Sequence, residues 1–245
     1  MVKEEFKMSN LSKISVAILA GGFGTRLQSV VNDKPKVLAD VNNHPFLEYL
    51  LNQLNSAHFK KIVLCTGYLH QQVKKTFGEK YKDINLLYSI EQKPLGTAGS
   101  LRKTLPLLDS ETILVMNGDS FCEIDFEKFW EFHIRKNSNV TIALTSVSDA
   151  NRYGTVNISS DDSITRFQEK KQGHKKGFIN AGIYLIKKKF IKQIPKHKEI
   201  SIERDIFPTW IVDGFYGYKA SNNFIDIGTP QSYERAEEFF ANYTV

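Results

Sequence analysis

The sequence predicts an α/β fold in which helices flank a Rossmann-like, mostly parallel sheet, with a β-rich elaboration in the second half of the chain. Three observations predict it. Five short apolar segments alternate with helix-like segments up to about residue 150. Beyond that point the strand-like segments follow one another more closely, as in hairpins. The chain has 245 residues, 41% of them hydrophobic, so it can bury a sizeable core.

The five apolar segments are expected to be strands that are buried on both faces. They are short, apolar along most of their length and rich in β-branched residues, a pattern typical of the inner strands of a parallel sheet. The expected strands are residues 14–20, 61–67, 84–90, 112–119 and 140–147.

Four helices are expected in the gaps between these strands. Residues 45–57 and 126–136 place apolar residues at intervals of three and four positions, as amphipathic helices do. Residues 70–78 and 96–108 fill the other two gaps. Because a helix between two strands lets both run in the same direction, this alternation predicts parallel strands with helices on both faces.

The second half of the chain is expected to contain mainly closely spaced strands. Residues 154–170 predict two strands across a polar turn, and residues 177–188 predict another. Residues 215–228 predict one or two more. This region is therefore interpreted as a β-rich elaboration of the same domain.

The chain is expected to close with a helix over residues 229–243. Thr229 is a suitable N-cap, and Pro230 suits the first helical position. Residues 1–10 are polar and charged and are expected to be a flexible tail, followed by a single domain over residues 11–245.

The charge balance favours an anionic ligand. The net charge is +6 and the isoelectric point is about 9.1. The cations are spread along the chain, and their densest runs lack interleaved aromatic residues, so nucleic acid is not expected as a partner.

Other classes of protein are disfavoured by the cysteines, the histidines and the N-terminal region. Cys65 and Cys122 lie in or beside apolar runs without a C-x-x-C pattern, so buried reduced thiols are expected in place of a disulfide. The six histidines show no pairing typical of zinc ligands. The first apolar run is too short to span a bilayer and no signal peptide is visible, so we expect a cytoplasmic protein without a membrane partner.

A glycine-rich turn follows the first expected strand, in the segment "ILAGGFGTRLQSVVNDKPKVL". Gly21, Gly22 and Gly24 are followed by Arg26, and Lys36 lies ten residues further along. Neither the dinucleotide-binding pattern nor the P-loop pattern fits, because the third glycine of the first and the Lys-Ser/Thr pair of the second are missing. The backbone N–H groups and the two cations still suit a phosphate. A purely structural turn with solvated cations is the alternative.

Two aspartates are candidates for a metal site. Asp119 lies at the carboxyl end of an expected strand, the same edge of the sheet as the glycine turn. Asp226 also follows apolar residues and precedes a turn and a helix. One or two carboxylates together with phosphate oxygens are the usual ligands of Mg²⁺. The alternatives are a hydrophilic loop residue at 119 and a helix-capping residue at 226.

Three further segments contain residues that could contact other parts of a ligand than its phosphate. Gly96 and Thr97 lie in a loop that would let a planar group approach the backbone, and Gln92 could pair with the edge of a base. Glu169 and Lys170 are consecutive on an expected strand, so only one of them would face a site. Around Asn180 and Gly182, a small and polar break interrupts an apolar strand, which indicates the close approach of a ligand or of backbone.

Seven of these segments together resemble the successive motifs of the sugar-1-phosphate nucleotidyltransferases, or NDP-sugar pyrophosphorylases. The segments are "LAGGFGTRL", "KPKVL" with Lys36, "EQKPLGTAG", "NGDS", "FQEK", "NAGIY" and "DIGTP". They occur in that family's order and extend from residue 14 to about residue 240. Within the family, the sequence most resembles the bacterial guanylyltransferases of D-glycero-D-manno-heptose 1-phosphate.

The resemblance implies the GT-A-like nucleotidyltransferase fold and a Mg²⁺-dependent reaction. In that reaction an NTP, GTP in the most similar members, and a sugar 1-phosphate give an NDP-sugar and pyrophosphate. The product would serve capsule or lipopolysaccharide synthesis. A homodimer is an expectation from the prevalence of twofold assemblies alone.

The resemblance also assigns roles to residues. The catalytic residues would be Arg26, Lys36 and Asp119, with Lys34 as the alternative to Lys36. The nucleotide-binding residues would be Leu19, Gly21, Gly22, Gly24, Thr25, Gln92, Gly96 and Thr97. The residues that bind the sugar phosphate would be Gly118, Tyr153, Gly154, Glu169, Lys170, Asn180 and Gly182. Asp119 and Asp226 would hold the metal.

Three alternatives stay open at this point. The first is the same reaction with another pair of substrates, as in the enzymes that make GDP-mannose, dTDP-glucose or UDP-glucose. The second is a nucleotide-binding module without turnover, which would not need two aspartates and two cations. The third is a GT-A glycosyltransferase, although the D-x-D pair typical of that class is missing around Asp119.

Overall fold

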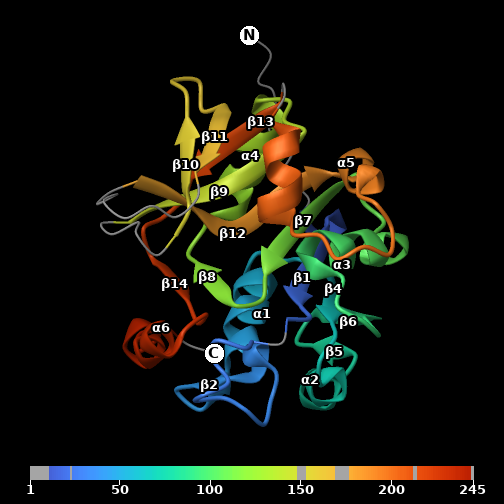
Figure 1. The fold of residues 1–245 in the computed structure, drawn as a ribbon, viewed down its shortest axis with the longest axis vertical. Coiled ribbons are helices and arrows are strands. Elements are labelled where there is room, and N and C mark those ends of the chain that lie inside the picture. Colours follow the sequence, from blue (N-terminus) through green and yellow to red (C-terminus); the bar gives the residue numbers. More distant parts are fainter. Residues whose placement is uncertain (1–10, 23, 148–152, 169–176, 212–213, 244–245) are drawn as a thin grey trace.

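A single ten-stranded mixed sheet forms the centre of the molecule (Figure 1). The computed structural model describes residues 11–22, 24–147, 153–168, 177–211 and 214–243. Along the main path the strand order is β11-β10-β12-β7-β1-β4-β6-β5, and β9 and β13 attach beside β12. None of the helices in these ranges combines the length and the apolar character that a membrane-spanning segment requires.

Four strands from the first half of the chain form the parallel core that the sequence predicts. β1 (Ser15–Ala20) pairs in parallel with β4 (Lys61–Thr66) on one side and with β7 (Thr112–Asn117) on the other. β6 (Ile84–Ile90) continues the parallel arrangement beyond β4, and the short β5 (Lys80–Tyr81) ends that edge antiparallel to β6. The carboxyl ends of these four parallel strands meet at one edge of the sheet, where ligands bind in open α/β folds.

The second half of the chain enters the middle of this sheet. β12 (Gly177–Lys187) is antiparallel to β7 and also to β9 (Val140–Val147), so it separates these two strands. The sequence predicts a strand at 140–147, and this is confirmed, but its neighbours are β12 and β13 (Phe215–Lys219). Since apolar content alone does not encode pairing, the insertion of β12 was not visible in the sequence pattern.

The remaining strands form the outer part of the second half. β10 (Thr155–Ile158) and β11 (Ile164–Gln168) are the hairpin predicted over 154–170, and β10 joins the sheet next to β12. Residues 215–228 contain two strands, but only β13 belongs to the main sheet. The second, β14 (Phe224–Asp226), pairs instead with β8 (Ser120–Cys122), which directly follows the end of β7. A last small pair is formed by β2 (Asp40–Val41) and β3 (His44–Pro45).

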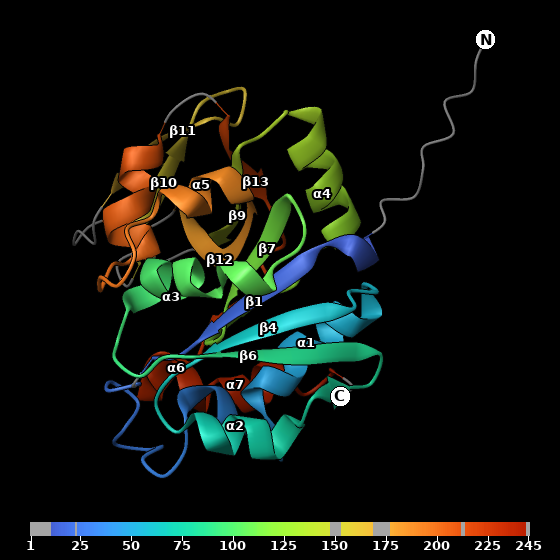
Figure 2. The same ribbon diagram turned by 90° about the vertical axis from the view of Figure 1, so that its right-hand side faces the viewer.

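Helices cover both faces of the sheet, as the alternation of strands and helices predicts (Figure 2). On one face lie α1 (Phe46–Ser56), α2 (His70–Phe77), α6 (Pro230–Glu234) and α7 (Ala236–Phe239). On the other lie α3 (Gly96–Thr104) and α5 (Lys188–Gln193). Two buried apolar clusters hold these layers to the sheet, and α4 (Phe126–Arg135) contributes Phe126 and Phe129 to the first of them.

Short helical turns complete the described part of the chain. They are the 3₁₀ turns η1 (Leu11–Lys13), η2 (Lys36–Leu38), η3 (Leu105–Leu107) and η5 (Phe207–Trp210), and the π-helical turn η4 (Ile202–Ile206). The helix predicted over 96–108 therefore ends at Thr104 and continues as a 3₁₀ turn that contains Pro106, because proline cannot donate the next helical hydrogen bond.

The closing helix begins as predicted but is divided into α6 and α7. Thr229 caps α6 by accepting a hydrogen bond from the Ser232 N–H, and Pro230 occupies the first helical position. The Ser232 hydroxyl in turn accepts from the Thr229 N–H, which completes a reciprocal capping box. This box fixes the start of α6 directly after β14, and so beside Asp226.

Candidate active site

A cavity of about 400 Å³ lies at the carboxyl ends of β1, β6 and β7. We call it the nucleotide cavity. Nearly all of the residues predicted to bind the nucleotide line it: Leu19, Gly21, Gly22, Gly24, Thr25, Gly96 and Thr97. Arg26, Lys36 and Asp119, the predicted catalytic residues, line it too.

A second cavity of about 630 Å³ adjoins the first, and we call it the sugar-phosphate cavity. Four of the residues predicted for the sugar phosphate line it: Tyr153, Gly154, Asn180 and Gly182. The two cavities share five lining residues, namely Arg26, Asn117, Asp119, Glu203 and Gly228. Two ligands bound in them would therefore meet at Asp119 and Arg26.

The glycine turn after β1 leaves space for a ligand on its outer side. Gly24 has a φ of +62°, a conformation that side chains rarely adopt, and its carbonyl accepts a hydrogen bond from the Leu27 N–H at 2.8 Å. A Cβ atom on Gly22 would meet no atom within 4 Å, so its surroundings are open. The turn thus presents backbone to open space and leads directly to Arg26, which is exposed.

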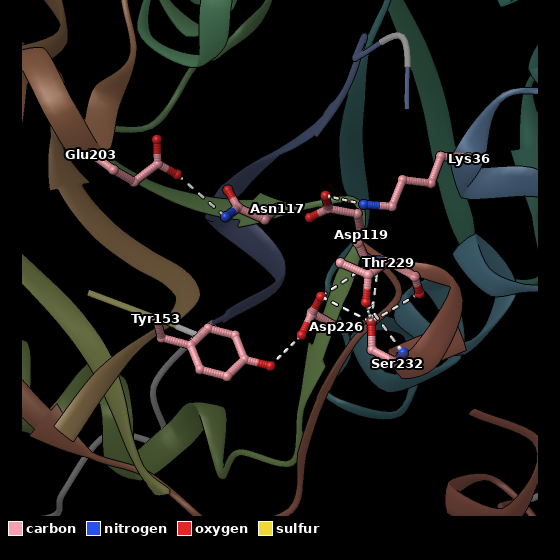
Figure 3. A network of polar contacts seen from close by, with 9 residues as sticks. Lys36, Asn117, Asp119, Tyr153, Glu203, Asp226, Thr229 and Ser232 are labelled. Atoms are coloured by element: carbon pink, nitrogen blue, oxygen red, sulfur yellow. Dashed lines mark hydrogen bonds and ion pairs between the residues drawn. The ribbon is translucent and has the colours of Figure 1, made fainter. Parts of the chain in front are cut away.

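Lys36 reaches into the junction of the cavities from η2. Its Nζ atom faces Asp119 (Figure 3) and lies 2.7 Å from Oδ2 of that residue. The Lys36 side chain is only 10% exposed. Lys34, the alternative phosphate contact, instead pairs with Asp40 at 2.6 Å and lines neither cavity. The geometry thus brings Lys36 to the site and leaves Lys34 outside it.

Asp119 and Asp226 are brought together by the small β8–β14 pair. Asp226 lies opposite Ser120 in this pair, and the Ile227 N–H donates to the Asp119 carbonyl at 2.9 Å. The Asp226 carboxylate accepts hydrogen bonds from the Gly228 N–H at 2.9 Å, from the Ser232 hydroxyl at 3.3 Å and from the Tyr153 hydroxyl (Figure 3). The capping position predicted as the alternative role of Asp226 belongs to Thr229.

The donor set at this junction fits a hard cation such as Mg²⁺. Both aspartates offer carboxylate oxygens. They are two ligands and not a complete protein cage, and the described residues contain no group of three or more His, Cys, Asp or Glu side chains that could hold a metal ion. Two carboxylates leave most of an octahedral shell to water and phosphate oxygens, which is the usual way in which Mg²⁺ is bound.

The loop before α3 is placed partly as predicted. Gly96 has a φ of +66°, and a Cβ atom there would lie 2.4 Å from the Ile200 carbonyl oxygen, so only glycine fits. Gln92 is exposed and lines a separate groove on the outer side of this loop. Its neighbour Glu91 lines the nucleotide cavity instead, with Oε2 accepting from the Leu95 N–H at 3.1 Å.

The predicted residues for the sugar phosphate have three different outcomes. Gly118 lines neither cavity, because it packs on β1, where its N–H donates to the Leu19 carbonyl at 2.9 Å. Glu169 and Lys170 lie outside the described residues. Gly182 has a φ of +77° at an irregularity of β12, and a Cβ atom there would lie 2.6 Å from the Ser120 hydroxyl.

Several polar residues that line the cavities were not assigned a role by sequence reasoning. Glu203 and Asn117 line both cavities, and Glu91 lines the first. Asn117 is the first residue of the segment "NGDS" and Glu91 the first of "EQKPLGTAG", so the motifs already contained both residues. Glu203 lies in a π-helical turn far from every motif, and no local periodicity marks it.

The two cysteines lie outside both cavities, as expected for structural residues. Both are buried and free. Burial raises the pKa of the Cys65 thiol, and also that of the Cys122 thiol, to about 12. Since the thiolate is the nucleophilic form, neither side chain is suited to covalent catalysis.

The chain is similar to known nucleotidyltransferases along nearly its whole length. Residues 15–242 match the family model described as nucleotidyl transferase. The chain is 37% identical to the D-glycero-alpha-D-manno-heptose 1-phosphate guanylyltransferase of Aneurinibacillus thermoaerophilus, with 92% of this chain and 98% of that protein covered. It is 36% identical to the enzyme of the same name from Campylobacter jejuni, with 88% and 95% covered.

A solved structure extends the similarity to the fold. The crystal structure of HddC from Yersinia pseudotuberculosis superposes with a TM-score of 0.83 at 34% identity, covering 93% of this chain and 99% of that one. A second crystal structure of HddC is complexed with GMP-PN. The matched family model spans nearly the whole chain and includes both cavities, so the chain belongs to the nucleotidyl transferase family.

Proposed function

We propose that this protein transfers the guanylyl group of GTP to D-glycero-D-manno-heptose 1-phosphate, giving the GDP-sugar and pyrophosphate. The observation that carries the proposal is the pair of joined cavities that share Asp119 and Arg26. The names of the two relatives from Aneurinibacillus and Campylobacter support the choice of substrates, as does the guanine nucleotide analogue bound to HddC.

The reaction is a displacement at the α-phosphorus of the nucleotide. An oxygen of the sugar 1-phosphate forms a new P–O bond, the bond to the β-phosphate breaks, and pyrophosphate leaves with its electron pair. The second pKa of a phosphate monoester is about 6, so the attacking group is already an anion at neutral pH. A general base is therefore not required, and the main task of the site is to bring two anions together in line.

The side chains at the junction perform this task. Arg26 can form a forked pair of hydrogen bonds with phosphate oxygens, and Lys36 supplies a nearly buried positive charge. Both would stabilise the charge that develops on the leaving pyrophosphate. When a phosphate enters, it competes with Asp119 for the ammonium group of Lys36.

Asp119 and Asp226 would hold a divalent cation, which we propose to be Mg²⁺. When bound, such an ion neutralises phosphate oxygens and orients the α-phosphate. The contacts of Asp226 with Tyr153, Gly228 and Ser232 would fix the orientation of its carboxylate, as outer contacts usually do for metal ligands.

Glu91 supports guanine as the base. The Watson–Crick edge of guanine presents adjacent N–H donors, which a carboxylate can accept, whereas adenine presents a ring nitrogen acceptor there. Glu91 lines the nucleotide cavity, and the Leu95 N–H occupies only one of its oxygens. We propose that Glu91, and not the outward-facing Gln92, selects the base.

The product of this reaction is an activated sugar donor. We propose that it serves surface polysaccharide synthesis, in capsule or lipopolysaccharide, and that the reaction takes place in the cytoplasm, where GTP is available.

Pyrophosphate release tests the proposal directly. The purified chain would be assayed with Mg²⁺ against GTP, ATP, UTP, CTP and dTTP. Each nucleotide would be combined with the manno-heptose, mannose and glucose 1-phosphates, with a chelator as the control. We expect the highest kcat/KM for GTP with the heptose phosphate. Activity in another combination would replace the substrate and keep the mechanism, whereas bound nucleotide without any pyrophosphate release would contradict the transferase function.

A further inference from the structure

Glu203 lies where the two cavities meet, with its carboxylate facing Asn117 (Figure 3). Both carboxylate oxygens accept hydrogen bonds from the protein. Oε1 accepts from Nδ2 of Asn117 at 3.3 Å and from the Tyr184 hydroxyl at 3.2 Å. Oε2 accepts from the hydroxyls of Thr97 at 3.0 Å and Ser201 at 3.1 Å. Because protein donors satisfy both oxygens, the carboxylate is suited to holding other residues in place and not to reacting with a substrate itself.

These donors belong to both halves of the site. Thr97 is at the start of α3 and lines the nucleotide cavity. Asn117 ends β7, two residues before Asp119. Tyr184 lies on β12 and accepts a hydrogen bond from Nδ2 of Asn180, which lines the sugar-phosphate cavity. A single carboxylate therefore links the nucleotide loop, the end of β7 and the strand that lines the second cavity.

The link to the nucleotide loop is reinforced by backbone contacts. The Thr97 hydroxyl accepts from the Ile202 N–H at 2.7 Å while it donates to Glu203. The Ala98 N–H donates to the Ile200 carbonyl, and the Ile200 N–H donates to the Leu95 carbonyl, both at 2.9 Å. The segment that carries Glu203 is thus tied to the nucleotide loop by both side-chain and backbone hydrogen bonds.

The other two donors depend strongly on Glu203. The side-chain oxygen of Asn117 is buried and has no hydrogen-bond partner among the described residues, so its amide is held through the nitrogen, which donates to Glu203 and also contacts the Tyr184 hydroxyl. Burial, together with the charge of Glu203, holds the pKa of the Tyr184 hydroxyl well above its usual value, so this group remains a donor. The π-helical geometry of η4 is also of a kind that occurs frequently at functional sites.

We propose that Glu203 is a positioning residue that holds the nucleotide loop in register with the sugar-phosphate strand, so that the attacking oxygen and the α-phosphorus are aligned. The inference rests on the proposed nucleotidyl transfer, and it adds a residue that none of the seven motifs contains.

The variant Glu203→Gln tests this role with little change in volume. Because the Tyr184 hydroxyl already accepts from Asn180, its proton needs an acceptor at residue 203, so the oxygen of the new glutamine should face Tyr184 and its amino group should face Thr97 and Ser201. The hydroxyls of Thr97 and Ser201 already accept the N–H groups of Ile202 and Arg204, and their protons would lose their acceptor. The substitution should therefore weaken the contacts that hold the nucleotide loop more than those around the sugar-phosphate cavity.

We expect kcat to fall and the KM for the NTP to rise, with a combined loss of about tenfold to hundredfold in kcat/KM. The KM for the sugar 1-phosphate should stay nearly unchanged. The matched control is Asp205→Asn, in the same π-helical turn, where the carboxylate is exposed and, within the part of the chain that the structure describes, accepts a hydrogen bond from the Ser201 N–H alone. This control should keep wild-type kinetics.

A double-mutant cycle separates positioning from a general loss of structure. Thr97→Val removes the hydroxyl that Glu203 holds, whereas Thr97→Ser keeps it. If Glu203 acts through Thr97, the double variant Thr97→Val/Glu203→Gln should be little worse than the poorer single variant, and Thr97→Ser should be near wild type. Additive losses, unchanged kinetics in Glu203→Gln, or a loss explained by the unfolded fraction in thermal melts would each overturn the proposal.

Two further measurements test the role of Glu203 if the Glu203→Gln variant does not fold or if the wild-type chain shows no activity. If Glu203→Gln does not fold, Thr97→Val alone tests the same contact, and an unchanged KM for the NTP would overturn the proposal. If the wild-type chain releases no pyrophosphate, the proposed function fails independently. Binding of Mg²⁺–GTP to wild type and to Glu203→Gln then tests the positioning role by itself, and equal affinities would overturn it.

Discussion

The nucleotide cavity and the sugar-phosphate cavity share Asp119 and Arg26 but are built in different ways. The first is formed largely by short loops that directly follow the parallel strands β1, β6 and β7. The second is lined by β10, β12 and β14, which form antiparallel pairs, and two of these strands pair with much earlier segments, β12 with β7 and β14 with β8. The first therefore depends mainly on local turns, and the second depends also on the pairing of strands that are far apart in the sequence.

This difference explains which residues of the site can be predicted from the sequence. A turn such as Gly21 to Arg26 needs particular residues at consecutive positions, because its backbone must bend and face a ligand. The part of the sugar-phosphate cavity that includes Asn180 needs only a strand, β12, that pairs with the correct strands of the sheet. The shared residues at the junction should therefore be the most sensitive to substitution, followed by the residues of each separate wall.

The largest effect is expected at the junction itself. Asp119→Asn should lower kcat by on the order of a hundredfold or more, because it removes a preorganised charge from the point where both substrates meet. Steady-state pyrophosphate release over a Mg²⁺ titration measures this. Asp109→Asn, which removes an exposed partner of Lys61, is the matched control and should have little effect. Wild-type turnover of Asp119→Asn at saturating Mg²⁺ would exclude a metal role for Asp119.

The second-largest effect is expected at Lys36, whose ammonium group lies beside Asp119. Lys36→Ala should also reduce kcat by about a hundredfold, since a nearly buried charge at the phosphates would be lost. Lys34→Ala is a natural control, because Lys34 pairs with Asp40 outside both cavities. The same assay at saturating substrates compares the two. A greater loss in Lys34→Ala than in Lys36→Ala would reverse the assignment of the phosphate-contacting lysine.

These two lysines also illustrate how far the sequence alone could be used. Both fit the spacing after the glycine turn, and only the fold of η2 places Lys36 in the cavity while Lys34 faces Asp40. The parallel core and its helices could be predicted, because each element leaves a periodic pattern of its own. The position of β12 between β7 and β9 could not, because strand pairing depends on contacts between distant segments.

The same limit applies within the site. Gln92 and Glu91 are adjacent polar residues, and the direction of the chain after β6 decides which of them faces the nucleotide cavity. Glu203 is more than eighty residues from Asn117 and more than a hundred from Thr97, yet it contacts both. Such a residue becomes visible only when the fold has brought these segments together.

A smaller effect is expected in the wall of the second cavity. Tyr153→Phe removes the hydroxyl that donates to Asp226 and should raise the KM for the sugar 1-phosphate by about tenfold, roughly the loss of one hydrogen bond to a charged group. The KM for the NTP should change little, because Tyr153 lines only the sugar-phosphate cavity. Tyr218→Phe, on β13 and outside both cavities, controls for general effects of losing a tyrosine hydroxyl. A rise in the NTP KM alone would contradict the division into two cavities.

The smallest effect is expected in the choice of base. Glu91→Gln replaces one carboxylate oxygen by an amino group that can donate to the ring nitrogen of adenine, so the ratio of kcat/KM for GTP to that for ATP should fall by about fivefold, the worth of one ordinary hydrogen bond. Competition between the two nucleotides in one reaction, followed by separation of the products, measures the ratio directly. Gln92→Ala is the matched control on the outer side of the loop and should leave the ratio unchanged. If Gln92→Ala changes the ratio and Glu91→Gln does not, the loop must turn when nucleotide binds. The nucleotide cavity would then change shape on binding, although it is formed by short loops that directly follow the parallel strands.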